Sequence, residues 1–93
     1  MNKADLTERL AERASIPKVR AAAYINILTD AIREALVEGE KVTISDFGTF
    51  KTSDRSGFIG HNPKTQDPMP VRPVRIPVFR AGKGLKKALN AEQ

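Results

Sequence analysis

The sequence lacks cysteine and tryptophan, and only 5% of its residues are aromatic. The absence of cysteine excludes disulfides, thiolate metal sites and nucleophilic cysteine chemistry, and it fits a reducing compartment. No apolar run is long enough to span a bilayer, so we expect a soluble, cytoplasmic protein with no membrane partner. With 93 residues and few aromatic side chains, one core is only marginally sufficient, and burial against a partner chain would stabilise the fold.

Acidic residues are also missing from the stretch between Pro68 and Ala91. Residues 1–50 contain seven Lys/Arg and eight Asp/Glu, whereas residues 51–93 contain nine and three. So uneven a distribution predicts a polyanionic partner for the second half. A solvated basic face is the alternative, but the run exceeds twenty residues and crosses from a predicted strand into a predicted helix.

Two helices are predicted in the first part of the chain. Asn2 is a suitable N-cap, with Asp5 three residues later as in a capping box. An apolar stripe then recurs every four residues, formed by Leu6, Leu10 and Ala14. Ser15-Ile16-Pro17 ends this helix and starts another, because proline is tolerated only in a first turn. The second helix has two apolar flanks, which indicates burial on more than one side, and it ends at Glu38-Gly39.

Strands are predicted in the second part. Residues 42–44 and 47–52 alternate as short strands joined by a tight turn at Ser45-Asp46. A long two-stranded ribbon follows, with one strand at residues 51–59 and a proline-rich return strand at residues 69–80. The prolines are compatible only with an edge strand. Such a ribbon has almost no core of its own.

The segment Gly60-His61-Asn62-Pro63-Lys64-Thr65 predicts the ribbon's turn, because proline fixes φ and asparagine tolerates unusual backbone angles. A proline at the tip of a basic ribbon suits a DNA groove, where it would act as a wedge between base pairs. Ser56-Gly57 is a candidate bend or bulge. A final helix is predicted from Lys83 to Asn90, with Leu85 and Leu89 facing inward.

Several side chains have both a functional and a structural interpretation. Phe47, Phe50 and Phe79 could stack on bases, but their places on strands near the helices favour a core. His61 stands alone, without cysteine or clustered carboxylates, so it is a poor metal or catalytic candidate and would contact DNA or solvent. Lys83 opens the last helix, where the dipole disfavours a cation and backbone N–H groups attract phosphate; this favours a DNA-facing role over a solvated face.

A set of short segments stands in a characteristic order without insertion: Met1-Asn2-Lys3, Phe47-Gly48-Thr49-Phe50-Lys51, Arg55, Gly60-X-Asn62-Pro63-Lys64-Thr65, Pro77-X-Phe79 and Gly82-Lys83-X-Leu85-Lys86. Together they resemble the bacterial histone-like HU and integration host factor family of DNA-bending proteins, over essentially the whole chain. The resemblance implies an α+β fold and an intertwined homodimer with a helical base, a small antiparallel sheet and two extended β-ribbon arms.

One domain is expected. Its helical dimerisation base would occupy residues 1–38, the sheet 41–53, the β-ribbon arm 54–80 and the C-terminal helix 82–91. In the family, the proline at the position of Pro63 enters the minor groove between base pairs and kinks the duplex. The basic pattern and the resemblance together predict these DNA-binding residues: Lys3, Lys51, Arg55, Phe58, His61, Asn62, Pro63, Lys64, Thr65, Arg72, Arg75, Arg80, Lys83 and Lys86. The expected dimer core is Phe47, Phe50 and Phe79.

The chain also departs from the family pattern. The family usually has a basic residue at the positions of Phe58 and His61, a glycine at Gln66 and often a glycine at Asp46. Phe58 replaces a cation, which predicts weaker binding to bent DNA than in typical members. The alternative is that Phe58 and Ile59 press on the sugars of the DNA or stiffen the arm. Gln66 predicts a differently shaped tip turn.

The leading hypothesis is a nucleoid-associated homodimer that binds duplex DNA with little sequence preference and bends and compacts it, without a cofactor. One alternative is a subunit of a sequence-specific heterodimer like integration host factor. Another is a dimeric interaction module for an acidic partner. RNA is a further candidate ligand, because phosphate contacts do not strongly distinguish the two polymers. An enzyme is disfavoured, since Asp46, Asp54 and Asp67 are scattered without metal-ligand spacing.

Overall fold

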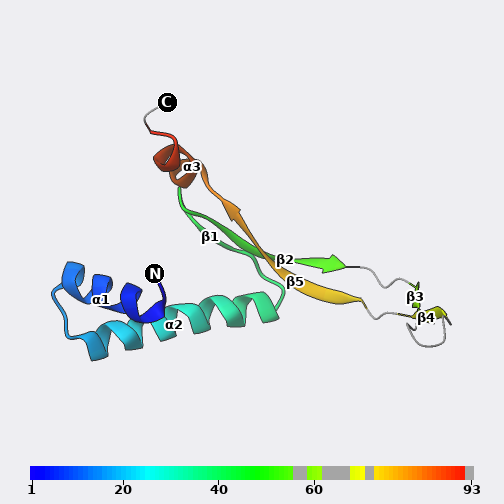
Figure 1. The fold of residues 1–93 in the computed structure, drawn as a ribbon, viewed down its shortest axis with the longest axis horizontal. Helices are drawn as coiled ribbons and strands as arrows, with labels where there is room; N and C mark the ends of the chain where they lie inside the picture. The colour runs from blue at the N-terminus through cyan, green and yellow to red at the C-terminus, as the bar shows by residue number, and fades with distance from the viewer. Residues whose placement is uncertain (56–58, 62–67, 71–72, 92–93) are drawn as a thin grey trace.

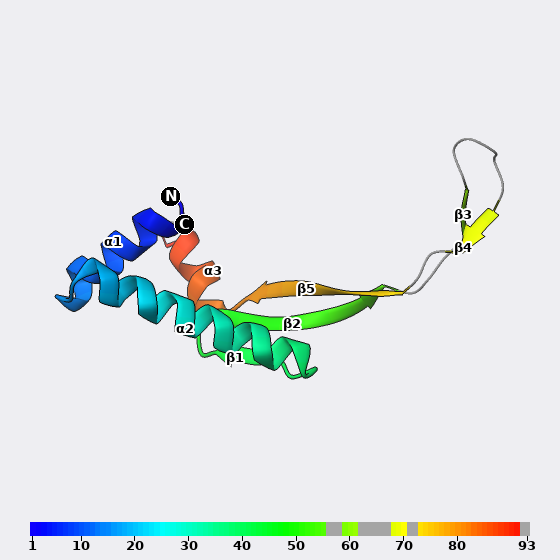
Figure 2. The same cartoon turned by 90° about the horizontal axis from the view of Figure 1, so that it is seen from below.

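The computed structural model describes residues 1–55, 59–61, 68–70 and 73–91. Its elements in chain order are α1 (Lys3–Ala14), α2 (Lys18–Val37), β1 (Val42–Ile44), β2 (Gly48–Arg55), β3 (Ile59–His61), β4 (Pro68–Pro70), β5 (Val74–Ala81) and α3 (Lys83–Leu89). The helices α1 and α2 form a hairpin, and the strands β2 and β5 run together away from it (Figure 1; Figure 2). The predicted α+β class is confirmed.

The start of α1 has the predicted capping box. The Asn2 Oδ1 accepts the backbone N–H of Asp5 at 2.9 Å, and the Asp5 Oδ2 accepts the backbone N–H of Asn2 at 3.1 Å. The predicted break is also confirmed, because Ser15 adopts a left-handed conformation with φ 54° after α1 ends. Pro17 is the N-cap of α2 rather than part of its first turn. Gly39, with φ 85°, follows the end of α2 as predicted.

Buried side chains are few and small, and they lie where α1 meets α2. Ala21 is fully buried, and Ala11 and Thr7 are nearly so. Thr7 satisfies its hydroxyl by donating to the carbonyl oxygen of Lys3 at 2.8 Å. The stripe predicted for α1 is therefore not its buried one, since Leu6 is 48% exposed. Small residues let the two helices approach closely but remove little apolar area from water.

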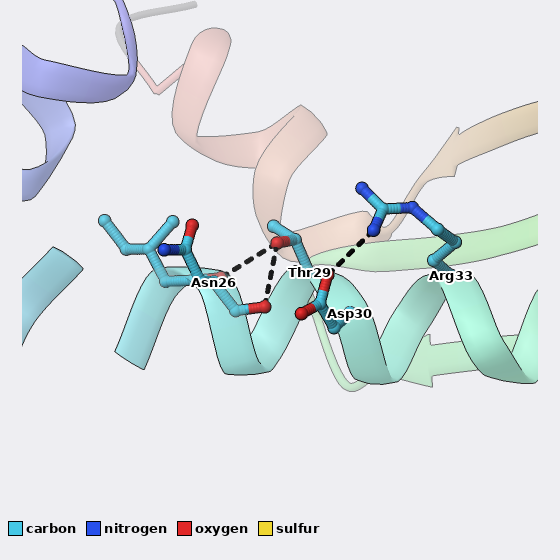
Figure 3. Close-up of polar contacts among 5 residues, drawn as sticks. Asn26, Thr29, Asp30 and Arg33 are labelled. Carbon is cyan, nitrogen blue, oxygen red and sulfur yellow. Dashed lines mark hydrogen bonds and ion pairs between the residues drawn. The ribbon is translucent and has the colours of Figure 1, made fainter. Parts of the chain in front are cut away.

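One stripe of α2 is polar and satisfies its own hydrogen bonds. The Thr29 hydroxyl donates to the carbonyl oxygens of Ile25 at 3.0 Å and Asn26 at 3.2 Å, and Arg33 pairs with Asp30 at 2.7 Å (Figure 3). Hydroxyls bonded to the preceding turn are a common way to place threonine inside a helix. Arg33 therefore already has an anionic partner on its own helix.

Other positions on α2 carry large apolar side chains that are more than half exposed: Val19, Tyr24, Ile27, Leu28 and Val37. The burial expected for both apolar flanks is thus not achieved within one chain. The radius of gyration is 19.2 Å, whereas a compact domain of this length has one of about 12 Å. A single chain therefore has an open, elongated shape with little interior.

The sheet has the strand order β1-β2-β5, and all pairs are antiparallel. Pairing of β2 with β5 runs from Gly48 opposite Ala81 to Arg55 opposite Val74. A second ladder, β3 with β4, begins at Ile59 opposite Pro70. Ile59 lies four residues after Arg55 and Pro70 four residues before Val74, so both ladders share one register. We call the pair of β2 and β5 the ribbon; β3 and β4 pair further along the chain in the same register.

The predictions for the proline-bearing strands and the last helix have mixed outcomes. The edge position is confirmed, because β5 borders the three-stranded sheet and β4 belongs to a two-stranded one. Leu85 in α3 is half-buried, but the inward orientation predicted for Leu89 is wrong within one chain, since 78% of it is exposed. The bend expected at Ser56-Gly57 lies outside the described residues.

Candidate nucleic-acid interface

The register of β2 and β5 sorts their side chains onto two faces. Directly opposed residues of an antiparallel pair project to the same side, and the sides alternate along each strand. One side, called the basic face from here on, consists of Thr49, Lys51, Ser53 and Arg55 on β2 with Arg80, Val78, Ile76 and Val74 on β5. The predicted contacts Lys51, Arg55 and Arg80 are thereby brought to one surface. The hydroxyls of Thr43 and Thr49, 3.1 Å apart, extend this surface onto β1.

The other face of the ribbon carries the aromatic cluster. The ring centroids of Phe50 and Phe79, an opposed pair, are 4.8 Å apart, and those of Phe47 and Phe79 are 5.5 Å apart. Tilted rings at these separations attract one another. Phe47 and Phe79 remain 46% and 42% exposed, so the cluster has open surface left for further packing.

Arg75 also belongs to the aromatic face, and it lies apart from the other predicted contacts on β5. Its guanidinium donates to the carbonyl oxygens of Leu36 and Val37 at 3.3–3.4 Å, at the end of α2. The Val37 carbonyl has no backbone donor in the described residues, whereas the Leu36 carbonyl also accepts the N–H of Gly39 at 3.1 Å. A cation at this end of α2 also complements the helix dipole. Arg75 thus connects the root of the ribbon to α2. The sequence offered no signal for this contact beyond a cation on an edge strand.

The lysines of α3 lie at opposite ends of the helix. Lys83 is its first residue, whereas Lys86 and Lys87 lie in its last turn, where the helix dipole favours them. The predicted mismatch between cation and dipole therefore applies to Lys83 alone. The helix is fixed to the β1–β2 turn by two backbone bonds, from Gly82 to the carbonyl of Phe47 at 2.8 Å and from Leu85 to that of Asp46 at 2.9 Å.

The remaining predicted contacts are elsewhere or not described. Lys3 is the exposed first residue of α1, on the helical hairpin rather than on the ribbon. His61 is the last residue of β3. The others lie outside the described residues: Phe58, Asn62, Pro63, Lys64, Thr65 and Arg72. Their part in a DNA interface stays a prediction.

The described residues include neither a cluster of metal ligands nor a helix that could span a membrane. Residues 1–55, 59–61, 68–70 and 73–91 contain no group of three or more His, Asp or Glu side chains that could hold a metal ion. No helix in the same ranges is long and apolar enough to cross a bilayer.

The chain thus combines a basic face on its ribbon, an aromatic cluster on the opposite face and a helix that carries lysines. A family model described as bacterial DNA-binding protein matches residues 1–90. The DNA-binding protein HU-beta of Neisseria meningitidis is 43% identical over 89 residues, which cover 96% of this chain and 100% of that protein. This chain belongs to the HU family of bacterial DNA-binding proteins. The HU-alpha protein of Vibrio cholerae is 40% identical over 97% of the chain and 100% of its own length.

Solved HU structures have the same fold. The chain of an Anabaena HU–DNA cocrystal structure superposes with a TM-score of 0.86 at 38% identity, covering 96% of this chain and 97% of that one. HU from Thermotoga maritima gives a TM-score of 0.67 at 29% identity, with 96% and 98% covered. The HU family suggested by the sequence motifs is therefore confirmed.

Proposed function

We propose that this protein is an architectural DNA-binding protein that acts as a homodimer, binds duplex DNA largely without sequence preference, and bends and compacts it. The carrying observation is the register that brings Lys51, Arg55 and Arg80 to one face of the ribbon, in a chain that closely matches one from an HU–DNA cocrystal. We further propose that it has no catalytic activity and that it is associated with the nucleoid in the cytoplasm.

Homodimer formation is supported by what one chain leaves exposed. Five large apolar side chains of α2, named above, and two of the three phenylalanines of the aromatic cluster are 42–84% exposed. An open groove of about 410 Å³ separates α2 from the root of the ribbon, lined by Ile32, Leu36, Thr52, Ile76 and Pro77 among others. Exposed apolar surface on this scale marks an interface rather than a free surface. A second copy packed on α2 and the aromatic face would supply the missing core.

DNA affinity would come chiefly from phosphates facing the basic face and the α3 lysines. Cations that neutralise phosphates release condensed counterions, so binding weakens steeply as salt rises. Contacts to phosphates position a protein on DNA without reading its sequence, which agrees with the proposed binding of duplex DNA largely without sequence preference.

Bending would come from Pro63 at the ribbon tip. Minor-groove architectural proteins, the HU family among them, unstack base steps with apolar wedges at a cost of a few kcal/mol, offset by the contacts that a bent duplex allows. Flexible steps, nicks and mismatches lower that cost, so such duplexes should bind more tightly.

Sedimentation of the purified chain, combined with gel shifts on intact, nicked and mismatched duplexes at low and moderate salt, tests this proposal. We expect a dimer, salt-sensitive binding, and a preference for the nicked and mismatched duplexes. A monomer, or a protein that leaves all three duplexes free at low salt, would refute the proposal. Equal affinity for the three would refute the wedge while leaving DNA binding intact.

A further inference from the structure

Asp46, in the turn between β1 and β2, has an unusual backbone and an unusual neighbour. Its φ of 66° is in the left-handed region, which asparagine and aspartate enter more readily than most residues but glycine enters most easily. Its carbonyl oxygen accepts the N–H of Leu85 at 2.9 Å. The turn is therefore fixed directly against the first residues of α3.

The side chain of Asp46 lies over Gly84. A Cβ placed on Gly84 would be 2.8 Å from the Asp46 Cβ, 3.3 Å from its Cγ and 2.7 Å from its carbonyl oxygen. No ordinary side chain at position 84 would fit, so the glycine provides the space in which the carboxylate arm of Asp46 rests. Gly84 directly follows Lys83 in the chain, and Lys87 lies three residues later, on the same side of α3 as Gly84.

We propose that Asp46 is a built-in attenuator of DNA affinity: it fixes a negative charge beside the α3 lysines and weakens their hold on phosphate. This inference rests on the proposed function, because it takes Lys83 and Lys86 to face DNA. The carboxylate forms no ion pair within 4.0 Å in the described part of the chain, so its charge is not neutralised there. A fixed carboxylate close to bound phosphates repels them. Its negative charge also lowers the positive electrostatic potential that the neighbouring lysines produce.

The decisive variant is Asp46→Asn, which keeps the side-chain shape and the tolerance of the left-handed region but removes the charge. Each chain loses one repulsive charge near phosphate, so a dimer should bind a plain duplex about three- to ten-fold more tightly at low salt. The gain should shrink toward none as salt rises, because exposed charges are screened beyond a Debye length. A thermal unfolding curve for the variant verifies that it is folded.

Glu12→Gln is the matched control, since it makes the same change in net charge on exposed α1, far along the chain from α3. We expect its affinity to stay within about two-fold of the wild type. Asp46→Gly is a second test, because it removes the charge together with the backbone constraint; it should also bind more tightly.

The possible results separate the two proposals. Tighter, salt-sensitive binding by Asp46→Asn but not by Glu12→Gln supports the attenuator. If the wild type binds DNA and Asp46→Asn binds with the same affinity at every salt concentration, the attenuator is overturned and the proposed function is not. An equal gain in both variants also overturns it, because the effect would then belong to net charge. A wild-type protein that ignores the duplex at low salt overturns the proposed function, and the attenuator with it.

Discussion

The guanidinium of Arg75 reaches the carbonyl oxygen of Val37, 38 residues earlier in the chain, with both Nη1 and Nη2 at 3.3 Å. This contact joins the root of the ribbon to the end of α2. In residues 1–55, 59–61, 68–70 and 73–91, no charged residue of the ribbon other than Arg75 is linked to the helices by a side-chain hydrogen bond or ion pair. The bonds are long, so each is weak, but the Val37 carbonyl has no backbone donor in the described residues. Arg75, which the sequence predicts to contact DNA, thus has a partner within the chain, and its part in a DNA interface stays a prediction.

Arg75→Ala should therefore lower stability more than affinity. Loss of the bonds to the end of α2 should reduce the free energy of unfolding by about 0.5–1.5 kcal/mol. Arg55→Ala, on the basic face, is the matched comparison and should do the reverse, with weaker DNA binding and stability changed by less than about 0.5 kcal/mol. Urea unfolding at fixed protein concentration and filter binding measure the two effects. If Arg75→Ala weakened binding as much as Arg55→Ala at unchanged stability, Arg75 would belong to the interface.

The basic face makes a quantitative prediction about salt. In a homodimer, Lys51→Ala removes two cations, and each phosphate contact contributes about 0.9 to the slope of log K against log salt. The slope should therefore become shallower by about two. Arg33→Ala serves as the control, because Arg33 pairs with Asp30 within α2, and its slope should not change. An unchanged slope for Lys51→Ala would remove this residue from the contacts.

Gly48 is required by the aromatic cluster rather than by its backbone angles. A Cβ there would collide with the ring of Phe79 and lie 2.7 Å from the carbonyl oxygen of Arg80. Gly48→Ala should destabilise the protein by about 1–3 kcal/mol, because the ring and the strand must both move. Gly39→Ala, where a Cβ meets nothing within 4 Å but φ is 85°, should cost about 1 kcal/mol. Chemical denaturation compares the two, and a smaller loss at Gly48 would mean that the ring yields easily.

The capping box of α1 is the simplest test of local structure. Asn2→Ala removes the acceptor for the Asp5 N–H and should cost about 1 kcal/mol of unfolding free energy. Asn2→Asp retains an acceptor and should restore nearly all of it. Thermal unfolding of the two variants, compared at one concentration, is the measurement; a fully stable Asn2→Ala would show that α1 does not need this cap.

Local chemistry made much of the fold predictable from sequence. The cap at Asn2, the break before Pro17 and the stop at Gly39 depend on neighbours within a few residues, and all three were found. The edge position of the proline-bearing strands follows from the missing N–H of proline, which no central strand tolerates.

Features set by tertiary contact could not be predicted in this way. Nothing near Arg75 in sequence shows that the end of α2 lies beside it. Likewise, nothing near Asp46 in sequence indicates that its side chain contacts Gly84. The prediction for Leu89 is wrong within one chain because a periodic apolar position indicates a buried face but does not indicate whether the same chain or another one buries it. The DNA contact at the tip of the ribbon rests on sequence motifs alone, and the role of Pro63 as a wedge between base pairs stays a prediction.

The scarcity of interior in one chain has a consequence for the protein's life in the cell. A polypeptide just released from the ribosome would hold its helical hairpin together around Ala11 and Ala21 but leave Phe47 and Ile27 open to chaperones and proteases. In the proposed homodimer a second copy would cover these side chains, so the steady-state amount of protein should fall disproportionately when synthesis slows.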